Sequence, residues 1–440
     1  MILNPDPNLS LGEYHAPLTD HEARIESNRC LYCYDAPCIQ ACPTHIDIPS
    51  FIKKISTGNV RGSARVILES NFLGGTCARV CPVQELCEGA CVLGSEHKPI
   101  EIGRLQRYAT DHVAQKGIDL FEAASPTGFK VAVVGSGPAG LSCAAELAKL
   151  GHAVTLFEKR ALAGGLSTYG IIVLREPVEV ALEEVRAVER LGVAVKTNVE
   201  VGRDIAFKDL QDGYDAIFLA VGLGGVPSMD IPNEAHILSG LEYIETSKLD
   251  PAALPKGKNV VVIGAGNTAI DAATVAKRWG AERVVMVYRR TEAEMTAYPF
   301  EYQFAKQEGI EYRFLTQPVG VVVEQGNVTG LECVRMALGS PDASGRPSPI
   351  PVENSEFVIA ADLVIKAIGQ EKPSLAAHLG LKTDKGYIAV DGDFKTSLEN
   401  VYAGGDCIRA RGDASTVMGV QDGKLAARAI HKRLLAIIKN

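Results

Sequence analysis

A pattern of strand, glycine turn and helix occurs twice in this chain of 440 residues. The first copy is the apolar run "FKVAVVGSGPAG", followed by "LSCAAELAKLGH" with helical apolar spacing, and the second is "KNVVVIGAGNTAIDAATVAKRWG". In such a turn the first glycine allows the sharp bend, the second lets a pyrophosphate approach the backbone, and the third lets the helix pack closely on the strand. These positions are Gly135, Gly137 and Gly140 in the first copy, and Gly264, Gly266 and Ala269 in the second. The chain is therefore predicted to hold two Rossmann-like dinucleotide-binding folds.

The residue that ends the second strand differs between the two copies. The strand "AVTLFEK" ends in Glu158, and an acid at this place can accept a hydrogen bond from a ribose hydroxyl. The strand "AERVVMVYRR" ends in Arg289 and Arg290, which suit a 2′-phosphate, although a pair of basic residues can also be a solvated strand end. We expect FAD in the first fold and NADP in the second, with NAD as an alternative.

A third segment, "NVYAGGDCIRARGDASTVMGVQDGK", is predicted to complete the flavin site. It places Gly405 and Asp406 at the end of a strand, and then a helix that begins near Thr416 to Gln421. Asp406 would accept from the ribityl chain, and the positive helix end would favour electron density on the reduced flavin. Because this segment follows the second fold, the FAD domain is expected to be discontinuous, with parts at 129–249 and 362–440 around a NAD(P) domain at 250–361.

Eight of the eleven cysteines lie within the first 91 residues, which we predict to be part of a separate helical domain at 1–128. The first run, "CLYCYDAPCIQACP", has the spacing C-x2-C-x4-C-x3-C-P, and the second, "CARVCPVQELCEGAC", has C-x3-C-x5-C-x3-C. Bacterial iron-sulfur runs similarly send a cysteine that precedes proline to another cluster. Two 4Fe-4S clusters are favoured, and zinc sites and structural thiols are the alternatives. The three scattered cysteines, Cys143, Cys333 and Cys407, are interpreted as small core residues.

Composition excludes several classes of function. The formal charge of −8 and the pI near 5.7 argue against binding nucleic acid through a broad basic face. The opening "MILNPDPNLSLGEYH" lacks the basic and apolar pattern of an export signal, and the chain contains no run of eighteen apolar residues. We expect a soluble cytoplasmic protein with no nucleic-acid or membrane partner.

With these motifs in this order, the whole chain resembles the small subunit of bacterial glutamate synthase and the N-terminal half of dihydropyrimidine dehydrogenase. The five residues between Cys81 and Cys87, together with "DAPC", "CPTHIDIPSFI" and "PIEIGRLQR", look like the dehydrogenase and its bacterial two-subunit version. The segment "VYRRTEAEM" is more like glutamate synthase, which stays as the alternative.

The resemblance implies ligands for both clusters. Cys30, Cys33, Cys38 and Cys91 would hold one cluster, and Cys42, Cys81, Cys87 and Gln106 the other, with Cys77 unligated. It also implies FAD contacts from Glu158 and Arg175 and contacts to a 2′-phosphate from Arg289 and Arg290. The predicted cofactor-binding residues are Gly135, Ser136, Gly137, Pro138, Ala139, Gly140, Glu158, Lys159, Gly165, Leu166, Arg175, Val201, Gly222, Gly264, Ala265, Gly266, Asn267, Thr268, Ala269, Arg289, Arg290, Ala367, Ile368, Gly369, Gly405, Asp406 and Gln421.

The expected reaction follows from what these cofactors carry. A nicotinamide delivers two electrons as a hydride and a cluster carries one, so a flavin is needed between them and no protein acid or base is predicted. The pyrimidine-reducing part of this family is an FMN barrel with further clusters, and a barrel alone takes about 250 residues. The chain is therefore expected to be the electron-input subunit of a hetero-oligomer in pyrimidine catabolism. It would oxidise NAD(P)H and supply electrons to a partner that reduces uracil or thymine to the 5,6-dihydropyrimidine.

Overall fold

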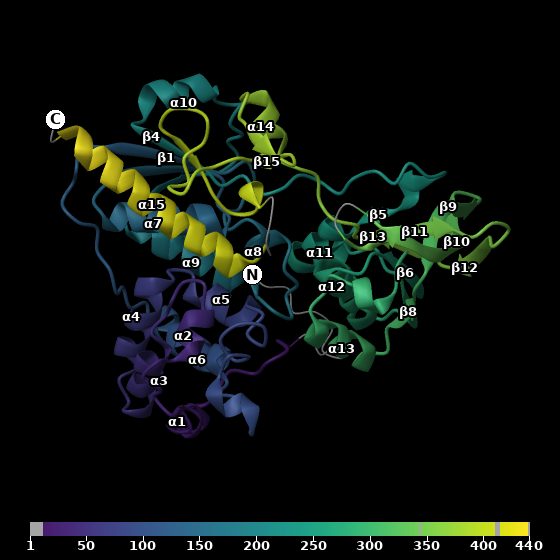
Figure 1. The fold of residues 1–440 in the computed structure, drawn as a ribbon, viewed down its shortest axis with the longest axis horizontal. Helices are drawn as coiled ribbons and strands as arrows, with labels where there is room; N and C mark the ends of the chain where they lie inside the picture. Colours follow the sequence, from purple (N-terminus) through teal and green to yellow (C-terminus); the bar gives the residue numbers. More distant parts are fainter. Residues whose placement is uncertain (1–11, 343–344, 410–413, 439–440) are drawn as a thin grey trace. The chain divides into compact units, whose positions relative to one another are not determined.

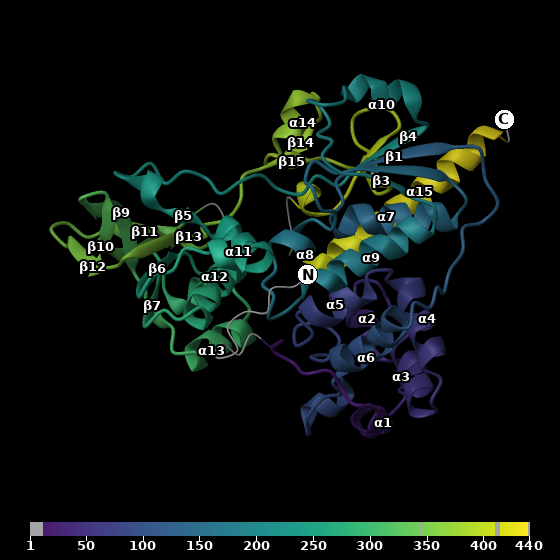
Figure 2. The same cartoon turned by 180° about the vertical axis from the view of Figure 1, so that it is seen from behind.

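The computed structural model describes residues 12–342, 345–409 and 414–438. It is an α/β protein in which helices precede two parallel sheets (Figures 1 and 2). One compact unit comprises Gly225–Glu371 with Tyr169–Leu174, and the other comprises Tyr14–Thr168, Arg175–Gly224 and Lys372–Asn440. In the described part of the chain, no helix combines the length and the apolar character that crossing a membrane requires.

The cysteine-rich region forms a helical domain within the larger unit. Its helices are α1 (Asp20–Asn28), α2 (Pro37–Ala41), α3 (Ile48–Ser56), α4 (Val60–Ser70), α5 (Gly74–Val80) and α6 (Ile102–Gln115). Local signals start several of them, since Thr19 forms a capping box with Glu22 before α1, and Asp47 caps α3. The apolar faces of α3, α4 and α6 meet at Phe51, Ile67 and Leu105, all fully buried. Helix packing thus fixes the positions of the cysteine loops.

The first sheet has the predicted Rossmann arrangement and lies in the same unit. Its parallel strands are ordered β16 (Val401–Ala403), β4 (Ala216–Leu219), β1 (Lys130–Val134), β2 (Ala153–Phe157) and β3 (Ala194–Lys196). Around them lie α7 (Pro138–Lys149), α8 (Leu166–Tyr169), α9 (Val178–Arg190), α10 (Phe207–Gly213), α14 (Ser374–His378), the hairpin β14 (Thr383–Asp384) and β15 (Tyr387–Ile388), and α15 (Thr416–Ile438). Because β16 and α15 come after the second fold in sequence, the predicted discontinuity of this domain is confirmed.

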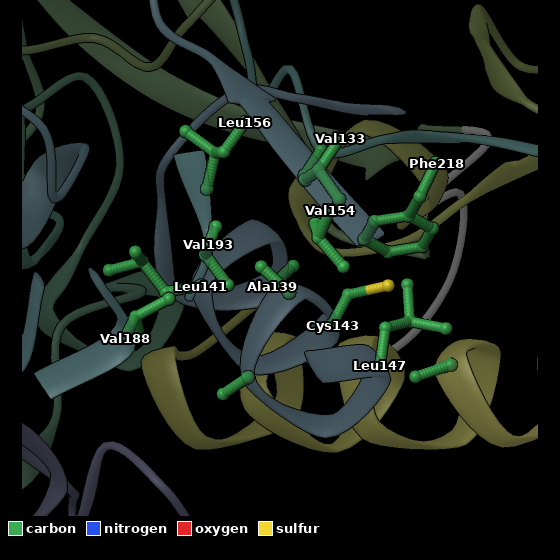
Figure 3. Close-up of a cluster of buried hydrophobic side chains, with 14 of the residues drawn as sticks. Val133, Ala139, Leu141, Cys143, Leu147, Val154, Leu156, Val188, Val193 and Phe218 are labelled. Atoms are coloured by element: carbon green, nitrogen blue, oxygen red, sulfur yellow. The ribbon is translucent and has the colours of Figure 1, made fainter. Parts of the chain in front are cut away.

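Helix α15, drawn in yellow, runs alongside α7 in both views (Figures 1 and 2). The approach is close because Gly423 has no side chain: a Cβ there would stand 2.1 Å from the carbonyl oxygen of Ala139. Cys143 and Leu147 of α7 pack in one cluster with Val133, Val154 and Phe218 of the sheet (Figure 3). Cys143, Cys333 and Cys407 are all fully buried, so the three scattered cysteines are core residues as predicted.

The smaller unit repeats the order of four of these strands, and its edge strand β5 (Leu238–Ser239) precedes the others in the chain whereas β16 follows them. Its parallel strands are β5, β13 (Leu363–Lys366), β6 (Asn259–Ile263), β7 (Arg283–Val287) and β8 (Glu311–Arg313), with helices α11 (Gly240–Leu249), α12 (Asn267–Arg278) and α13 (Pro299–Gln307). A second, antiparallel sheet contains β9 (Thr316–Glu324), β10 (Asn327–Pro341), β11 (Pro347–Pro351) and β12 (Phe357–Ala360). Strands β10 and β11 pair antiparallel up to Pro341 and Pro347. The segment "GSPDASGRPSP" is predicted to be a hairpin loop, and residues 343–344 of it lie outside the described residues.

The limits of this unit differ from the predicted domain limits of 250 and 361. Strand β5 pairs with β13, and β13 pairs with β6, so both strands belong to the sheet of the smaller unit. A strand of two residues has no periodicity from which a sequence pattern could be recognised. Strand β13 begins two residues after the predicted limit at 361, and only its pairing with its neighbours assigns it to this sheet.

Candidate functional site

The first glycine turn leaves open space where a pyrophosphate would lie. Gly135 has φ +99°, and a Cβ there would stand 2.3 Å from the oxygen of Ala220. A Cβ on Gly140 would stand 2.0 Å from the oxygen of Gly135, whereas one on Gly137 would meet nothing within 4 Å. The outer two glycines are thus required by the fold, whereas the middle one borders open space that suits an approaching pyrophosphate. Pro138 then begins α7, whose N-terminal N–H groups favour an anion.

Glu158 lies at the end of β2 and holds this turn together. Its Oε2 accepts hydrogen bonds from the backbone N–H (3.1 Å) and the hydroxyl (2.5 Å) of Ser136, and its Oε1 accepts from the N–H of Arg160 (2.8 Å). Gly165 packs against the turn, since a Cβ there would stand 2.6 Å from the Cα of Gly137. The bond from Ser136 to Glu158 is an additional feature that the sequence pattern did not indicate.

The remaining predicted flavin contacts in this part of the chain differ in how far they are exposed. Leu166 begins α8 with 40% of its surface exposed, while Val201 is buried and forms an isolated bridge with Ile205. Lys159 is exposed, Arg175 is half-buried, and Gly222 has φ +62° with open space where a side chain would be. Contact of these residues with FAD stays a prediction.

The C-terminal segment adds a buried polar site beside α7. Gly405 has φ +80°, and its N–H donates to Oδ2 of Asp422 at 2.9 Å, while Arg409 also donates to Asp422. Burial raises the pKa of Asp406 and that of Asp422.

Oε1 of Gln421 is buried and accepts no hydrogen bond from the described residues. A buried acceptor of this kind fits a ligand that donates to it. Helix α15 begins at Thr416, as predicted, and Asp422 is a residue that sequence reasoning missed.

The second glycine turn has the same construction in the smaller unit. Gly264 has φ +132°, and a Cβ there would stand 2.2 Å from the oxygen of Ala367, the first residue after β13. Gly266 precedes Asn267 and Thr268, where α12 begins, and Ala269 is fully buried in place of the third glycine. Ala265 is also buried, whereas Ile368 is 37% exposed and Gly369 has φ +105°. The predicted nucleotide-binding residues of this turn therefore lie at the carboxyl ends of β6 and β13.

The two arginines after β7 differ in their surroundings. Arg290 is only 4% exposed, and its guanidinium donates to Oδ2 of Asp342 (2.8 Å) and to the carbonyl oxygen of Pro347 (2.9 Å). Arg289 is exposed. The guanidinium of Arg290 is thus held by groups of the protein itself, and Arg289 is the more accessible of the two for a 2′-phosphate.

The cysteines of the helical domain line two separate cavities. The first cysteine cavity is lined by four cysteines, Cys30, Cys33, Cys38 and Cys91, with apolar neighbours that include Ile48, Ile52 and Ile100. The cysteine run at residues 30–38 therefore shares a cavity with Cys91 of the other run. These are the four residues predicted for one cluster, and the cavity lies within the helical domain.

The second cysteine cavity is lined by Cys42, Cys77, Cys81 and Cys87, together with Gln106 and Val417. It brings the predicted ligands Cys42, Cys81, Cys87 and Gln106 together, and Cys77 lies beside them. The amide nitrogen of Gln106 donates to the carbonyl oxygen of Gly74 at 2.8 Å, which fixes the side chain in this wall. Val417 belongs to α15, so the flavin domain contributes to this cavity.

The donor set suits the positively charged iron ions of a metal cluster. Burial raises the pKa of Cys38 to about 11 and that of Cys87 well above its ordinary value. The neighbouring Cys77, burial and the thiols of Cys87 and Cys42 likewise raise the pKa of Cys81. Thiolates crowded together in this way are stabilised when a metal binds them. Among the residues that the structure describes, no three His, Cys, Asp or Glu side chains are arranged to hold a single metal ion.

Polar contacts connect the helical domain to α9 of the flavin domain. Oε1 of Glu184 accepts from the N–H groups of Gly75 (2.8 Å) and Thr76 (3.0 Å) at the start of α5. The hydroxyl of Thr76 lies 2.6 Å from Oε2 of Glu184 and 2.5 Å from Oε1 of Glu176. Burial raises the pKa of Glu184 to about 8. These residues were not singled out from the sequence, because nothing local marks contacts between segments about 100 residues apart.

Protein-family models match both the dinucleotide-binding region and the cysteine-rich helical domain. Residues 129–429 match the family model for pyridine nucleotide-disulphide oxidoreductases. The chain belongs to this family. Residues 8–118 match the model described as dihydropyrimidine dehydrogenase domain II, 4Fe-4S cluster. This member of the family is therefore an NAD(P)H-dependent flavin oxidoreductase with an N-terminal 4Fe-4S domain.

Curated relatives extend over nearly all of the chain. The glutamate synthase (NADPH) small chain of Escherichia coli is 35% identical, covering 95% of this chain and 93% of its own length. The dihydropyrimidine dehydrogenase subunit PreT of the same organism is 33% identical, covering 96% and 97%. The NADP(+)-dependent formate dehydrogenase subunit beta of Moorella thermoacetica is 38% identical over 91% of this chain, which spans only 60% of that relative's length. The predicted resemblance is confirmed.

A solved structure supports the fold of the flavin and nucleotide domains. FprA of Mycobacterium tuberculosis in complex with NADPH superposes with a TM-score of 0.58 at 20% identity, over 71% of this chain and 86% of that one. At this identity the likeness shows the fold alone.

Proposed function

We propose that this chain is the electron-input subunit of a hetero-oligomeric reductase. It accepts a hydride from NAD(P)H at FAD and passes the electrons singly through two 4Fe-4S clusters to a partner that reduces uracil or thymine to the 5,6-dihydropyrimidine. FAD, when bound, supplies the conversion from two-electron to one-electron chemistry. The chain's own residues bind and orient the cofactors and exclude water around them.

One observation carries this proposal: a single helix, α15, contributes to both kinds of site. Val417 lines the second cysteine cavity, and Gln421, one turn further along the same helix, has the buried acceptor that fits a flavin donor. Residues four apart lie on the same side of a helix, about 6 Å from each other. A flavin that donates to Gln421 would therefore lie next to the second cysteine cavity across one helix face.

This arrangement suggests the order of electron transfer. The second cysteine cavity receives a wall residue from the flavin domain, whereas every residue that lines the first cysteine cavity comes from the helical domain. We infer that electrons reach the cluster of the second cavity first. They then pass to the cluster of the first cavity, from which the partner would accept them.

The choice of partner depends on the cysteine spacing and the relatives. The five residues between Cys81 and Cys87, together with the likeness to PreT over 97% of its length, favour a pyrimidine-reducing partner. The glutamate synthase small chain is the second candidate, supported by 35% identity and the segment "VYRRTEAEM". In that case the partner would be an amidotransferase chain.

The experiment is a reconstitution. Anaerobically purified protein should contain FAD and close to eight iron atoms per chain, and it should oxidise NADPH with an artificial acceptor without reducing uracil. Adding a pyrimidine-reducing subunit should start uracil-dependent NADPH oxidation. Zinc in place of iron would overturn the cluster assignment. NADPH oxidation that requires an amidotransferase chain with glutamine and 2-oxoglutarate would favour the second candidate.

A further inference from the structure

Lys424 reaches from the flavin domain into the cluster domain. It lies on α15, and only 8% of its surface is exposed. Its ammonium donates to the carbonyl oxygen of Ser70 (2.7 Å) and to that of Thr44 (3.1 Å), both in the helical domain. Because Lys424 follows Val417 by seven residues, the two side chains leave α15 on the same side.

The two carbonyl groups that bind Lys424 belong to residues next in sequence to Pro43 and Asn71, which line the second cysteine cavity. Thr44 lies two residues after Cys42, and its hydroxyl oxygen is 3.3 Å from the sulfur of Cys42. Ser70 directly precedes Asn71, which lines the cavity. The ammonium is therefore held against the backbone that carries one of the predicted cluster ligands.

This buried cation has neutral hydrogen-bond acceptors. Among the residues that the structure describes, the nearby carboxylate of Glu146 forms ion pairs with Lys149 (3.0 Å) and Arg428 (2.8 Å), and no carboxylate pairs with Lys424. Burial, followed by the charge of Arg428, lowers the pKa of Lys424 to about 8, so the side chain is still mainly charged at pH 7. A buried charge without an ion pair is costly unless other negative charge lies nearby.

A 4Fe-4S cluster held by three thiolates supplies that negative charge. When it accepts one electron from the reduced flavin, its negative charge increases, no bond forms, and the lysine keeps its protons. A fixed cation close by stabilises the reduced cluster more than the oxidised one. We propose that Lys424 raises the reduction potential of the cluster in the second cysteine cavity and so favours electron transfer from the flavin. This inference rests on the function proposed above.

The test is a redox titration of the loaded protein at pH 7, followed by low-temperature EPR. Lys424→Met removes the charge and the donor, Lys424→Gln removes the charge but keeps a donor, and Lys424→Arg keeps both. Lys432→Met, an exposed position on the same helix, is the matched control. Iron and FAD are counted in every sample before titration.

We expect Lys424→Met and Lys424→Gln to lower the midpoint potential of one cluster, with about a tenfold loss in the equilibrium constant for its reduction, equal to about 59 mV. Lys424→Arg and Lys432→Met should keep the wild-type value. Unchanged potentials in both neutral variants, with iron intact, would show that Lys424 is only a structural link and would overturn the inference. An equal fall in Lys424→Arg would overturn it too. Absence of iron from the wild-type protein would instead overturn the proposed function.

Discussion

Replacing Glu184 with glutamine should remove a pH-dependent instability from the contact between the helical domain and α9. The hydroxyl of Thr76 has one proton, yet it lies within hydrogen-bond distance of Glu184 and Glu176, at 2.6 and 2.5 Å. A proton on one carboxyl group is needed to satisfy both contacts. Glutamine resembles the protonated form of Glu184, because its amide can donate to Thr76 while its oxygen accepts from the two N–H groups of α5.

The magnitude follows from the pKa of Glu184, which burial raises from 4.5 to about 8. Because the folded-state pKa is higher than that of the unfolded chain, the stabilisation is complete below pH 4.5 and is lost as the pH rises to 8. The whole change amounts to about 5 kcal/mol in the free energy of unfolding, of which about 2 kcal/mol falls between pH 6 and pH 8. Glu184→Gln should not show this loss.

Thermal unfolding of the loaded protein under anaerobic conditions measures the effect. Going from pH 6 to pH 8 should lower the Tm of the wild type relative to Glu184→Gln by about 2 to 4 °C. Glu183→Gln, a neighbouring variant whose carboxylate pairs with Arg186 and Arg190 at the surface, is the control and should follow the wild type. Infrared spectra should also show a protonated carboxyl group at pH 7 that Glu184→Gln lacks. Equal pH dependence in the wild type and Glu184→Gln would refute the reasoning.

Three further outcomes are expected. Cys42→Ala should remove or alter the cluster of the second cysteine cavity, whereas Cys77→Ala should keep both clusters and cost about 1 kcal/mol of stability; iron counts and EPR distinguish the two. Arg289→Gln should raise the KM for NADPH about tenfold and leave the KM for NADH nearly unchanged. Arg290→Gln should mainly lower the Tm, because Arg290 is buried in an internal ion pair with Asp342. Gly137→Ala should weaken FAD binding without unfolding the protein, as judged by flavin content and circular dichroism, since its Cβ would enter the open space above the turn.

The sequence by itself determined the parts of this protein that depend on local pattern. Gly135 and Gly264 each require a positive φ, and the apolar strand before them and the helix after them are continuous in the chain, so both Rossmann-like folds could be predicted. The spacing of the cysteines indicated iron-sulfur chemistry, because each cysteine run is also a local pattern in the chain. The discontinuous flavin domain could also be predicted, because its closing motif around Gly405 and Asp406 is itself local.

Only the tertiary structure decided which distant groups meet. Cys91 shares a cavity with Cys30, although spacing alone would also allow each cysteine run to hold its own cluster. Arg289 and Arg290 are equivalent in sequence, but folding buries one against Asp342 and exposes the other. In sequence Lys424 is an ordinary helix lysine, and only the packing of α15 brings it to the carbonyl groups of Thr44 and Ser70, which lie 380 and 354 residues earlier in the chain. Burial and charge depend on all the elements that surround a side chain, and no local pattern encodes those surroundings.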